Sequence, residues 1–86
     1  MAKTRTENIA YGKSQYISAD GCFAISFFRP TTAPAVSVEG IDIEAGQTLS
    51  IKQNVGDEDH SNYQITFSNN QDNSNLLHVI KVMPIR

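Results

Sequence analysis

Short runs in which apolar and polar residues alternate fill the chain from residue 22 onward, and they constrain its fold more than any other feature. Residues 23–27 and 63–67 both place a large apolar side chain at every second position. A period of two is that of a β-strand with one buried face. No stretch repeats with a helical period over a useful length. The alternation therefore predicts an all-β fold.

The sharpest local signal is a hairpin centred on Glu39 and Gly40, which separate Val-Ser-Val from Ile-Asp-Ile. A two-residue turn at this point would place Val38 opposite Ile41 and Val36 opposite Ile43. All four aliphatic side chains would then share one face of the hairpin. Register and burial agree, so the sequence predicts this pairing.

A further alternating segment at residues 49–51 and an apolar segment at residues 76–82 bring the expected total to about six strands, separated by turn and loop signals. Residues 35–53 are predicted to form a three-strand meander. Two polar stretches, 54–62 and 68–75, are predicted to be loops. This pattern is typical of a small antiparallel β-sandwich or barrel.

Residues 1–20 differ from the rest of the chain because they are polar and carry mixed charges. Their large apolar side chains fit neither a strand nor a helix period, and are Ile9, Tyr11, Tyr16 and Ile17. The turn signal Asp20-Gly21 ends this stretch. We therefore expect an extended N-terminal arm over residues 1–20, either mobile or held by a partner, and a single β domain over residues 21–86.

Composition excludes several classes of protein. A chain of 86 residues favours one domain, and its formal charge of -2 argues against a broad basic surface for nucleic acid. No apolar run approaches the roughly 20 residues of a membrane helix, and the first residues do not resemble a signal peptide. The single cysteine, Cys22, excludes an internal disulfide framework.

The expected core is small, which points to assembly with other chains. Domains of this size gain only about 3–5 kcal/mol from a single core, and many use disulfides, metals or partners in addition. The last expected strand, 76–82, is apolar on both faces. Either Leu77 and Val79 lie on a face that contacts a partner, or this is a central strand covered on both sides. The arm residues Ile9, Tyr11, Tyr16 and Ile17 are predicted as further partner contacts, because spaced anchors suit an extended segment lying along a neighbour.

The acidic run at residues 57–60 is the densest group of ionisable residues. Asp57 and Asp59 have the alternating spacing of calcium ligands, but Asn62 and Ser68 replace the glycine and glutamate of a calcium loop. We expect a solvated loop and no metal site, with Asp57 and Asp59 as weak candidates. The two histidines lack zinc-ligand spacing.

No segment predicts catalysis. Cys22 would need a neighbouring base and an orienting group to act as a nucleophile, and a buried structural cysteine is the favoured alternative. The serines lie outside any nucleophile-elbow motif, and the glycines form no phosphate-binding loop. We expect a protein that is not an enzyme and uses no cofactor.

A turn, a loop and a strand together carry a family resemblance. They are Glu39-Gly40, Asn54-x-Gly56-Asp57-x-Asp59 and Tyr63-x-Ile65-x-Phe67. The segment from Val36 to Lys81, about half of the chain, resembles small virion structural proteins of tailed bacteriophages. The resemblance implies a head decoration, connector or tail component with no catalytic residues. It also implies synthesis in the host cytoplasm, residence in the virion, and contacts with copies of itself and with proteins such as the major capsid protein.

We therefore expect a non-enzymatic virion protein, most specifically a head decoration or auxiliary capsid protein. One alternative is a small β-barrel that binds single-stranded nucleic acid by stacking bases on aromatic side chains. Another is a β domain of a tail or fibre that takes part in adsorption. A secreted domain that binds carbohydrate or a receptor would show exposed aromatic side chains on a concave face.

Overall fold

The computed structural model describes residues 4–54 and 57–85, and these residues form eight β-strands and no helix. The strands are β1 (Thr4–Tyr11), β2 (Gln15–Ser18), β3 (Ala24–Phe28), β4 (Val36–Val38), β5 (Ile41–Ile43), β6 (Thr48–Lys52), β7 (Asn62–Phe67) and β8 (Leu77–Pro84). The expected all-β sandwich is confirmed.

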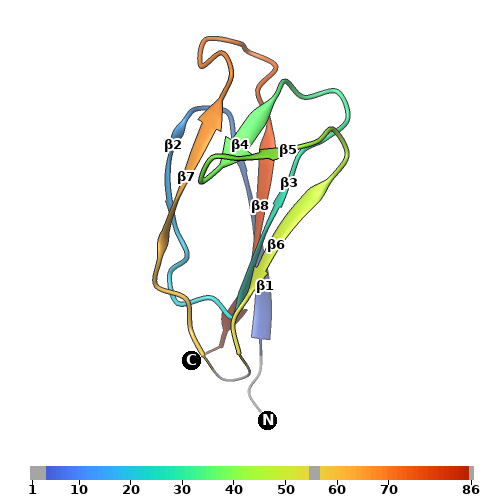
Figure 1. Cartoon of the computed structure of the whole chain (residues 1–86). Helices are drawn as coiled ribbons and strands as arrows, with labels where there is room; N and C mark the ends of the chain where they lie inside the picture. The colour runs from blue at the N-terminus through green and yellow to red at the C-terminus, as the bar shows by residue number, and fades with distance from the viewer. Residues whose placement is uncertain (1–3, 55–56, 86) are drawn as a thin grey trace.

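Two four-stranded antiparallel sheets lie face to face (Figure 1). Sheet A has the order β1-β8-β3-β6, and sheet B has the order β2-β7-β4-β5. Each strand of the first half pairs with one of the second half in reverse order, from β1 with β8 to β4 with β5. The chain is thus one long hairpin wrapped into two sheets, which is the strand order of an eight-stranded jelly roll.

The predicted hairpin at Glu39-Gly40 is the tip of this wrapped structure, and its register is confirmed: Val38 pairs with Ile41 and Val36 with Ile43. Both turn residues have positive φ, 52° for Glu39 and 79° for Gly40. Two consecutive left-handed residues match the twist of a two-residue hairpin, and glycine adopts that conformation without strain. Three of the four aliphatic side chains are buried, whereas Ile41 is 55% exposed at the edge of the sheet.

The predicted meander over residues 35–53 is wrong, because β6 pairs with β3 in the other sheet. The turn after β5 crosses from the edge of sheet B to the edge of sheet A. Two backbone bonds hold this crossing, from Gly46 N to Arg29 O at 2.8 Å and from Arg29 N to Gln47 O at 3.1 Å. The crossing places the apolar residues of β6 beside those of β3, where they pack against the core.

The predicted N-terminal arm is also corrected. Residues 4–11 pair along their whole length with β8, and residues 15–18 pair with β7, so both segments belong to the sandwich. The irregular spacing of the apolar residues in this segment has a structural cause. Residues 12–14 carry the chain from sheet A to sheet B, so the alternation of β1 does not continue into β2. Edge strands also bury less surface than central ones. These two strands account for the difference between about six expected strands and eight.

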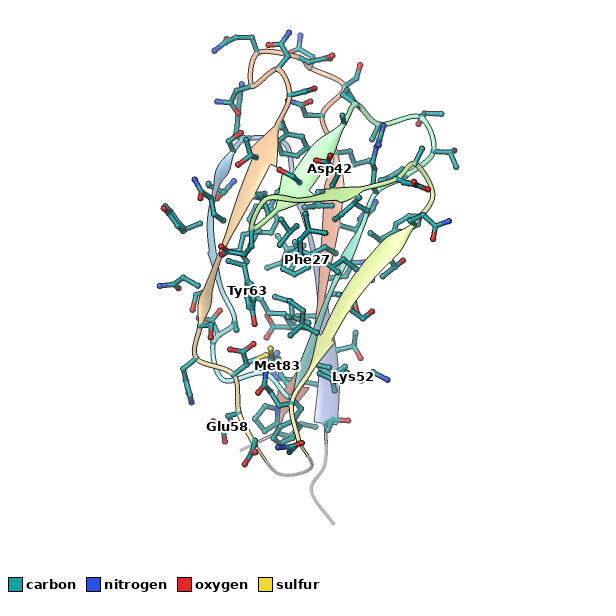
Figure 2. All side chains as sticks on the ribbon, in the orientation of Figure 1. Phe27, Asp42, Lys52, Glu58, Tyr63 and Met83 are labelled. Carbon is teal, nitrogen blue, oxygen red and sulfur yellow. The ribbon has the colours of Figure 1, made fainter. Side chains whose placement is uncertain are left out.

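The core lies between the two sheets. Phe27 from sheet A is fully buried and meets Tyr63 from sheet B edge-to-face, with ring centroids 5.7 Å apart (Figure 2). Aliphatic side chains from both sheets surround this pair, including Ile25, Ile65 and Leu77. Aromatic pairs of this geometry stabilise a core beyond the area that they bury.

Candidate interaction surfaces

Three of the residues predicted to contact partners lie in the core instead. Ile17 is 2% exposed, Leu77 is fully buried and Val79 is 1% exposed. The strands β2 and β8 turn these side chains toward the opposite sheet, so the predicted contact role is wrong for all three. β8 is a central strand, as in the alternative, but only its Leu77 and Val79 face is covered by the opposite sheet.

The other three predicted partner residues remain at or near the surface. Tyr11 is half-buried and packs against the core cluster. Ile9 is 44% exposed and Tyr16 is 68% exposed. Ile9 lies on the outermost strand of sheet A and Tyr16 on the outermost strand of sheet B. Of the predicted contacts, these two side chains are the ones most accessible to another molecule.

The outer face of sheet A is formed by the even-numbered residues of its four strands. Its centre is mainly apolar: Ala24, Phe28, Ile80 and Val82 are all half-buried and no described segment covers them, and Ser26, paired with Ile80, lies among them. Threonine, serine and asparagine surround this centre. Among the described residues of the face, Lys52 is the single one with a formal charge.

The outer face of sheet B has a different composition. Its outward side chains are polar or charged apart from the ring of Tyr16, and include Asn62, Gln64, Thr66 and Asp42. A solvent-facing antiparallel sheet normally has this composition. The outer face of sheet A, with its half-buried apolar side chains, therefore differs from a typical solvent-facing sheet.

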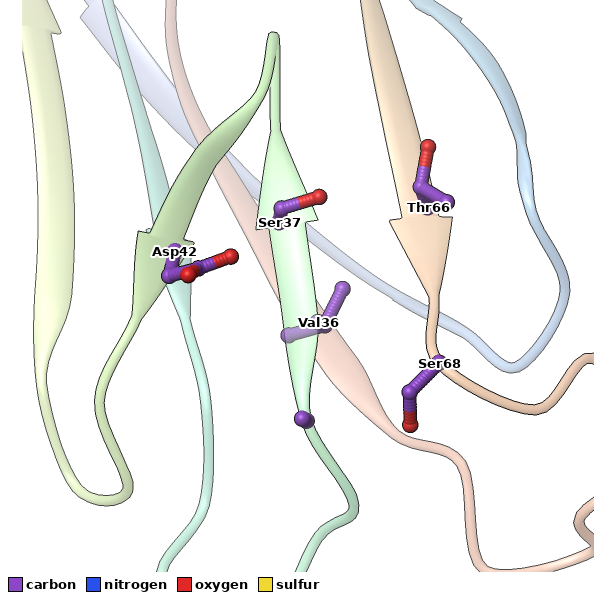
Figure 3. Close-up of a pocket in the computed structure, with 6 residues that line it drawn as sticks. Val36, Ser37, Asp42, Thr66 and Ser68 are labelled. Carbon is purple, nitrogen blue, oxygen red and sulfur yellow. The ribbon is translucent and has the colours of Figure 1, made fainter.

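A shallow hollow of about 130 Å³ lies on the outer face of sheet B (Figure 3). Side chains of Ser37, Asp42, Thr66 and Ser68 line it. Small-molecule sites are usually clefts of roughly 300–1,000 Å³ with mostly apolar walls. The hollow is smaller than such sites.

Sequence reasoning did not single out the outer face of β8, because both faces of the strand are apolar and nothing in the sequence shows that Lys81 is buried. This lysine shares a face with Leu77 and Val79, and a charge normally marks the solvent side of a strand. In the structure, however, the Lys81 side chain is only 5% exposed, and its Nζ lies 3.0 Å from Oδ2 of Asp20. Hydrogen bonding to Ser18 and to Lys81 lowers the pKa of the Asp20 carboxyl.

This ion pair yields a stability prediction. Asp20→Asn retains a side chain suited to the positive φ of 55° at this position, but removes the countercharge of a buried ammonium. We expect the free energy of unfolding to fall by about 1 kcal/mol, because Asp20 itself is more than half exposed. The double variant Asp20→Asn with Lys81→Met should recover at least wild-type stability, since replacing a buried ion pair by apolar groups is often neutral or favourable. Urea titrations at neutral pH measure both effects, and a double variant less stable than the single one would contradict the argument.

Asp59, one of the two weak metal candidates, is 4% exposed and has protein partners for its carboxylate. Tyr63 donates its hydroxyl to Oδ2, Gln53 donates from Nε2 at 3.3 Å, and the Ser61 amide donates to Oδ1 at 2.8 Å. Burial alone would raise the pKa of Asp59, but these hydrogen bonds outweigh it and lower the pKa. Burial and the bond to Asp59 also raise the pKa of Tyr63 to about 12.

Cys22 joins this polar cluster through the backbone. The Asp59 amide donates to Cys22 O at 2.8 Å, and the side chain of Cys22 is fully buried. Burial, and then the charge of Asp59, raise the pKa of the thiol, which favours the unreactive protonated form. The two histidines have other neighbours: His60 lies 3.4 Å from Glu58, and His78 stacks on Phe28.

Asp57, the other metal candidate, is exposed, and its amide donates to Asn54 O at 2.9 Å. Over residues 4–54 and 57–85, no three or more His, Cys, Asp or Glu side chains cluster in a way that could hold a metal ion. The same residues include no helix long and apolar enough to cross a lipid bilayer.

Comparison with known proteins gives no relative. No protein-family model matches the sequence, and neither a curated protein nor a solved structure matches it significantly.

Proposed function

We propose that this chain is a non-enzymatic structural protein of a virion, and that it attaches to the particle through the outer face of sheet A. The observation that carries the proposal is the uncharged apolar centre of that face, formed by Ile80, Val82, Ala24 and Phe28. An exposed apolar patch with a polar rim is characteristic of a surface that contacts another protein. A head decoration or auxiliary capsid protein needs one such surface.

The jelly-roll strand order is compatible with this role, because viral capsid domains use it. Lectins and cupins use it too, so the fold does not select among these functions. The contrast between the two outer faces favours a protein contact, since the outer face of sheet A has an apolar centre and the outer face of sheet B is polar or charged apart from one exposed aromatic ring, Tyr16.

The distribution of basic side chains disfavours the alternative of a single-stranded nucleic-acid module. Lys81 is buried against Asp20, and Arg5 pairs with Glu7. Arg29 donates to the backbone carbonyls of Ala33 and Ile43. A groove that follows a phosphate backbone needs several free cations along one path, and these three are already engaged within the fold.

The test is incorporation of the chain into purified phage particles, measured by quantitative mass spectrometry. We expect the wild-type chain in many copies per particle, and Ile80→Lys to lower its incorporation at least about tenfold, because a lysine in the centre of an apolar contact leaves a buried charge. Gln64→Lys adds the same charge to the outer face of sheet B and should incorporate as well as wild type.

Urea titration of both variants shows whether each remains folded. Equal incorporation of Ile80→Lys and wild type would exclude this face as the contact. Absence of the chain from particles, together with oligonucleotide binding that weakens steeply with salt, would favour the nucleic-acid alternative.

A further inference from the structure

The sandwich has two open edges with different composition. β1 and β2 form the outermost strands at one edge, and β5 and β6 form them at the other. Each of these strands pairs with a neighbour on one side and with no described strand on the other. Edge strands present free backbone N–H and C=O groups that can pair with another chain.

The two edges differ in shape. At the first edge, Ile9 projects from β1 with 44% of its surface exposed. At the second edge, a hollow of about 280 Å³ opens between β5 and β6, and Ile41, Ile43 and Leu49 contribute to its walls. Ile41 is 55% exposed beside this hollow. One edge thus carries an apolar projection, and the other carries a recess in which these apolar side chains stand beside polar and acidic ones such as Asp42 and Glu44.

The register of sheet A places the projection and the recess at the same level. Ile9 pairs with Val79, Val79 with Phe27, and Phe27 with Leu49. This line crosses the sheet from one edge to the other at right angles to the strands. A second copy placed beside the first in the same orientation would therefore bring its Ile9 next to Leu49.

Strand direction also permits this contact. The three pairings that connect β1 to β6 are all antiparallel, so β1 of a second copy in the same orientation runs antiparallel to β6. The same holds for β2 and β5 in sheet B. Both sheets can thus continue into the next copy with ordinary antiparallel pairing.

The charges at the two edges of sheet B are complementary. Gln15 lies on the line that runs through Ile65 and Val38 to Ile41. Lys13 lies two residues before Gln15, in the segment that leads into β2, and the exposed Asp42 and Glu44 lie on β5 and directly after it. Lys13 Nζ donates to Asn70 O at 2.9 Å, which leaves two of its three N–H donors for another partner.

We propose that copies of this chain associate head to tail, with the β1/β2 edge of one copy against the β5/β6 edge of the next. Ile9 enters the recess beside Leu49 and Ile41, and Lys13 meets Asp42 and Glu44. Such a contact joins two different surfaces, so it propagates into a closed ring or a filament. The inference names a partner for the proposed structural role and rests on that role, although it is tested on the purified chain alone.

Sedimentation velocity over a range of concentrations gives the first test. We expect the wild-type chain to form species larger than a dimer, and Ile9→Lys to raise the dissociation constant at least about tenfold. Ile9 is 44% exposed on an edge strand, where a lysine side chain can extend into solvent, so this change should leave the fold intact. Gln64→Lys, which adds the same charge to the exposed outer face of β7, a strand that is not at either edge, should associate like wild type.

A mixing experiment distinguishes this contact from a two-fold dimer. The Ile9→Lys variant retains only a working β5/β6 edge, and a variant with Ile41→Lys and Asp42→Lys retains only a working β1/β2 edge. Each should be monomeric alone, and an equimolar mixture should form a dimer of one copy each. Homodimers of either variant alone would overturn the proposal, because they require a symmetric interface.

The proposal also fails if the wild-type chain stays monomeric up to about 1 mM, or if Ile9→Lys associates as tightly as wild type. These outcomes are separate from the proposed function. A monomeric chain that still needs Ile80 for incorporation would retain the virion role and lose the edge contact. A chain that associates normally but is absent from particles would retain the edge contact and lose the virion role.

Discussion

Phe27→Ala is expected to lower the free energy of unfolding by about 3–5 kcal/mol, because it removes the largest fully buried side chain and leaves a cavity between the sheets. The change also removes the edge-to-face contact with Tyr63. Total stabilities of single domains are about 5–15 kcal/mol, so a domain with a core this small should be close to unfolding. In a domain of this size, each kcal/mol corresponds to about 4–8 °C in Tm.

The neighbouring residue provides a matched control for this prediction. Phe28 has the same side chain but lies on the outer face of sheet A, half-buried and stacked on His78 at 6.1 Å. Phe28→Ala should cost about 1 kcal/mol or less, since the lost contact is open to solvent. Urea titration and thermal melting measure both variants. Similar losses for the two would mean that the sheet does not separate a buried face from an exposed one at this point.

The parts of the fold that could be predicted from the sequence are those with local information. Glu39-Gly40 specifies its own turn conformation, and the alternation on either side of it has one register that buries the aliphatic residues. The strands around Phe27 and Ile65 were predictable for the same reason. In each case the alternation of a few consecutive residues indicates both that the segment is a strand and which of its two faces is buried.

Long-range pairing was not predictable in this way. β5 and β6 are consecutive and close in sequence, so a meander was the simplest interpretation, yet they belong to different sheets. The pairing of β6 with β3 depends on how Leu49 and Ile51 fit against Phe27 and Ile25, and no local pattern contains that information. β1 and β2 were missed because edge strands need little apolar surface of their own when β8 and β7 provide the ladder.

The outer face of sheet A could not be predicted as a candidate surface from the sequence pattern of β8. Both faces of that strand are apolar, and the one charge, Lys81, marked the wrong face as exposed because its partner Asp20 is distant in sequence. With Lys81 buried, Ile80 and Val82 face outward. A single long-range ion pair thus reverses which side of the strand is available to a partner.

Asp59→Ala is expected to lower the free energy of unfolding by about 3 kcal/mol at neutral pH. The variant removes the acceptor of the Tyr63 hydroxyl, the Gln53 amide and the Ser61 N–H, and each buried donor left without a partner costs about 1–3 kcal/mol. Asp57→Ala is the matched control, because Asp57 is an exposed carboxylate two residues earlier in the same loop. We expect it to change stability by less than about 0.5 kcal/mol.

The acid side of the stability profile provides a second measurement of the same carboxylate. The folded state holds the pKa of Asp59 below the ordinary value of 3.8, so above pH 4 the ionised carboxylate stabilises the fold. That contribution is lost as the pH falls below 3.8 and through the lowered pKa, because the unfolded chain then binds more protons than the folded one. Asp20 contributes in the same direction.

Between pH 5 and pH 2, about one decade or more on either side of the ordinary carboxyl pKa, the free energy of unfolding of the wild type should therefore decrease. Asp59→Asn should start from a lower value and decrease less, because it has lost one of the two carboxyls, Asp59 and Asp20, whose pKa the fold lowers. Asp57→Ala retains both Asp59 and Asp20 and should follow the wild-type decrease. If Asp59→Asn lost as much stability on acidification as wild type, the Tyr63, Ser61 and Gln53 hydrogen bonds would not be what stabilises the charged form.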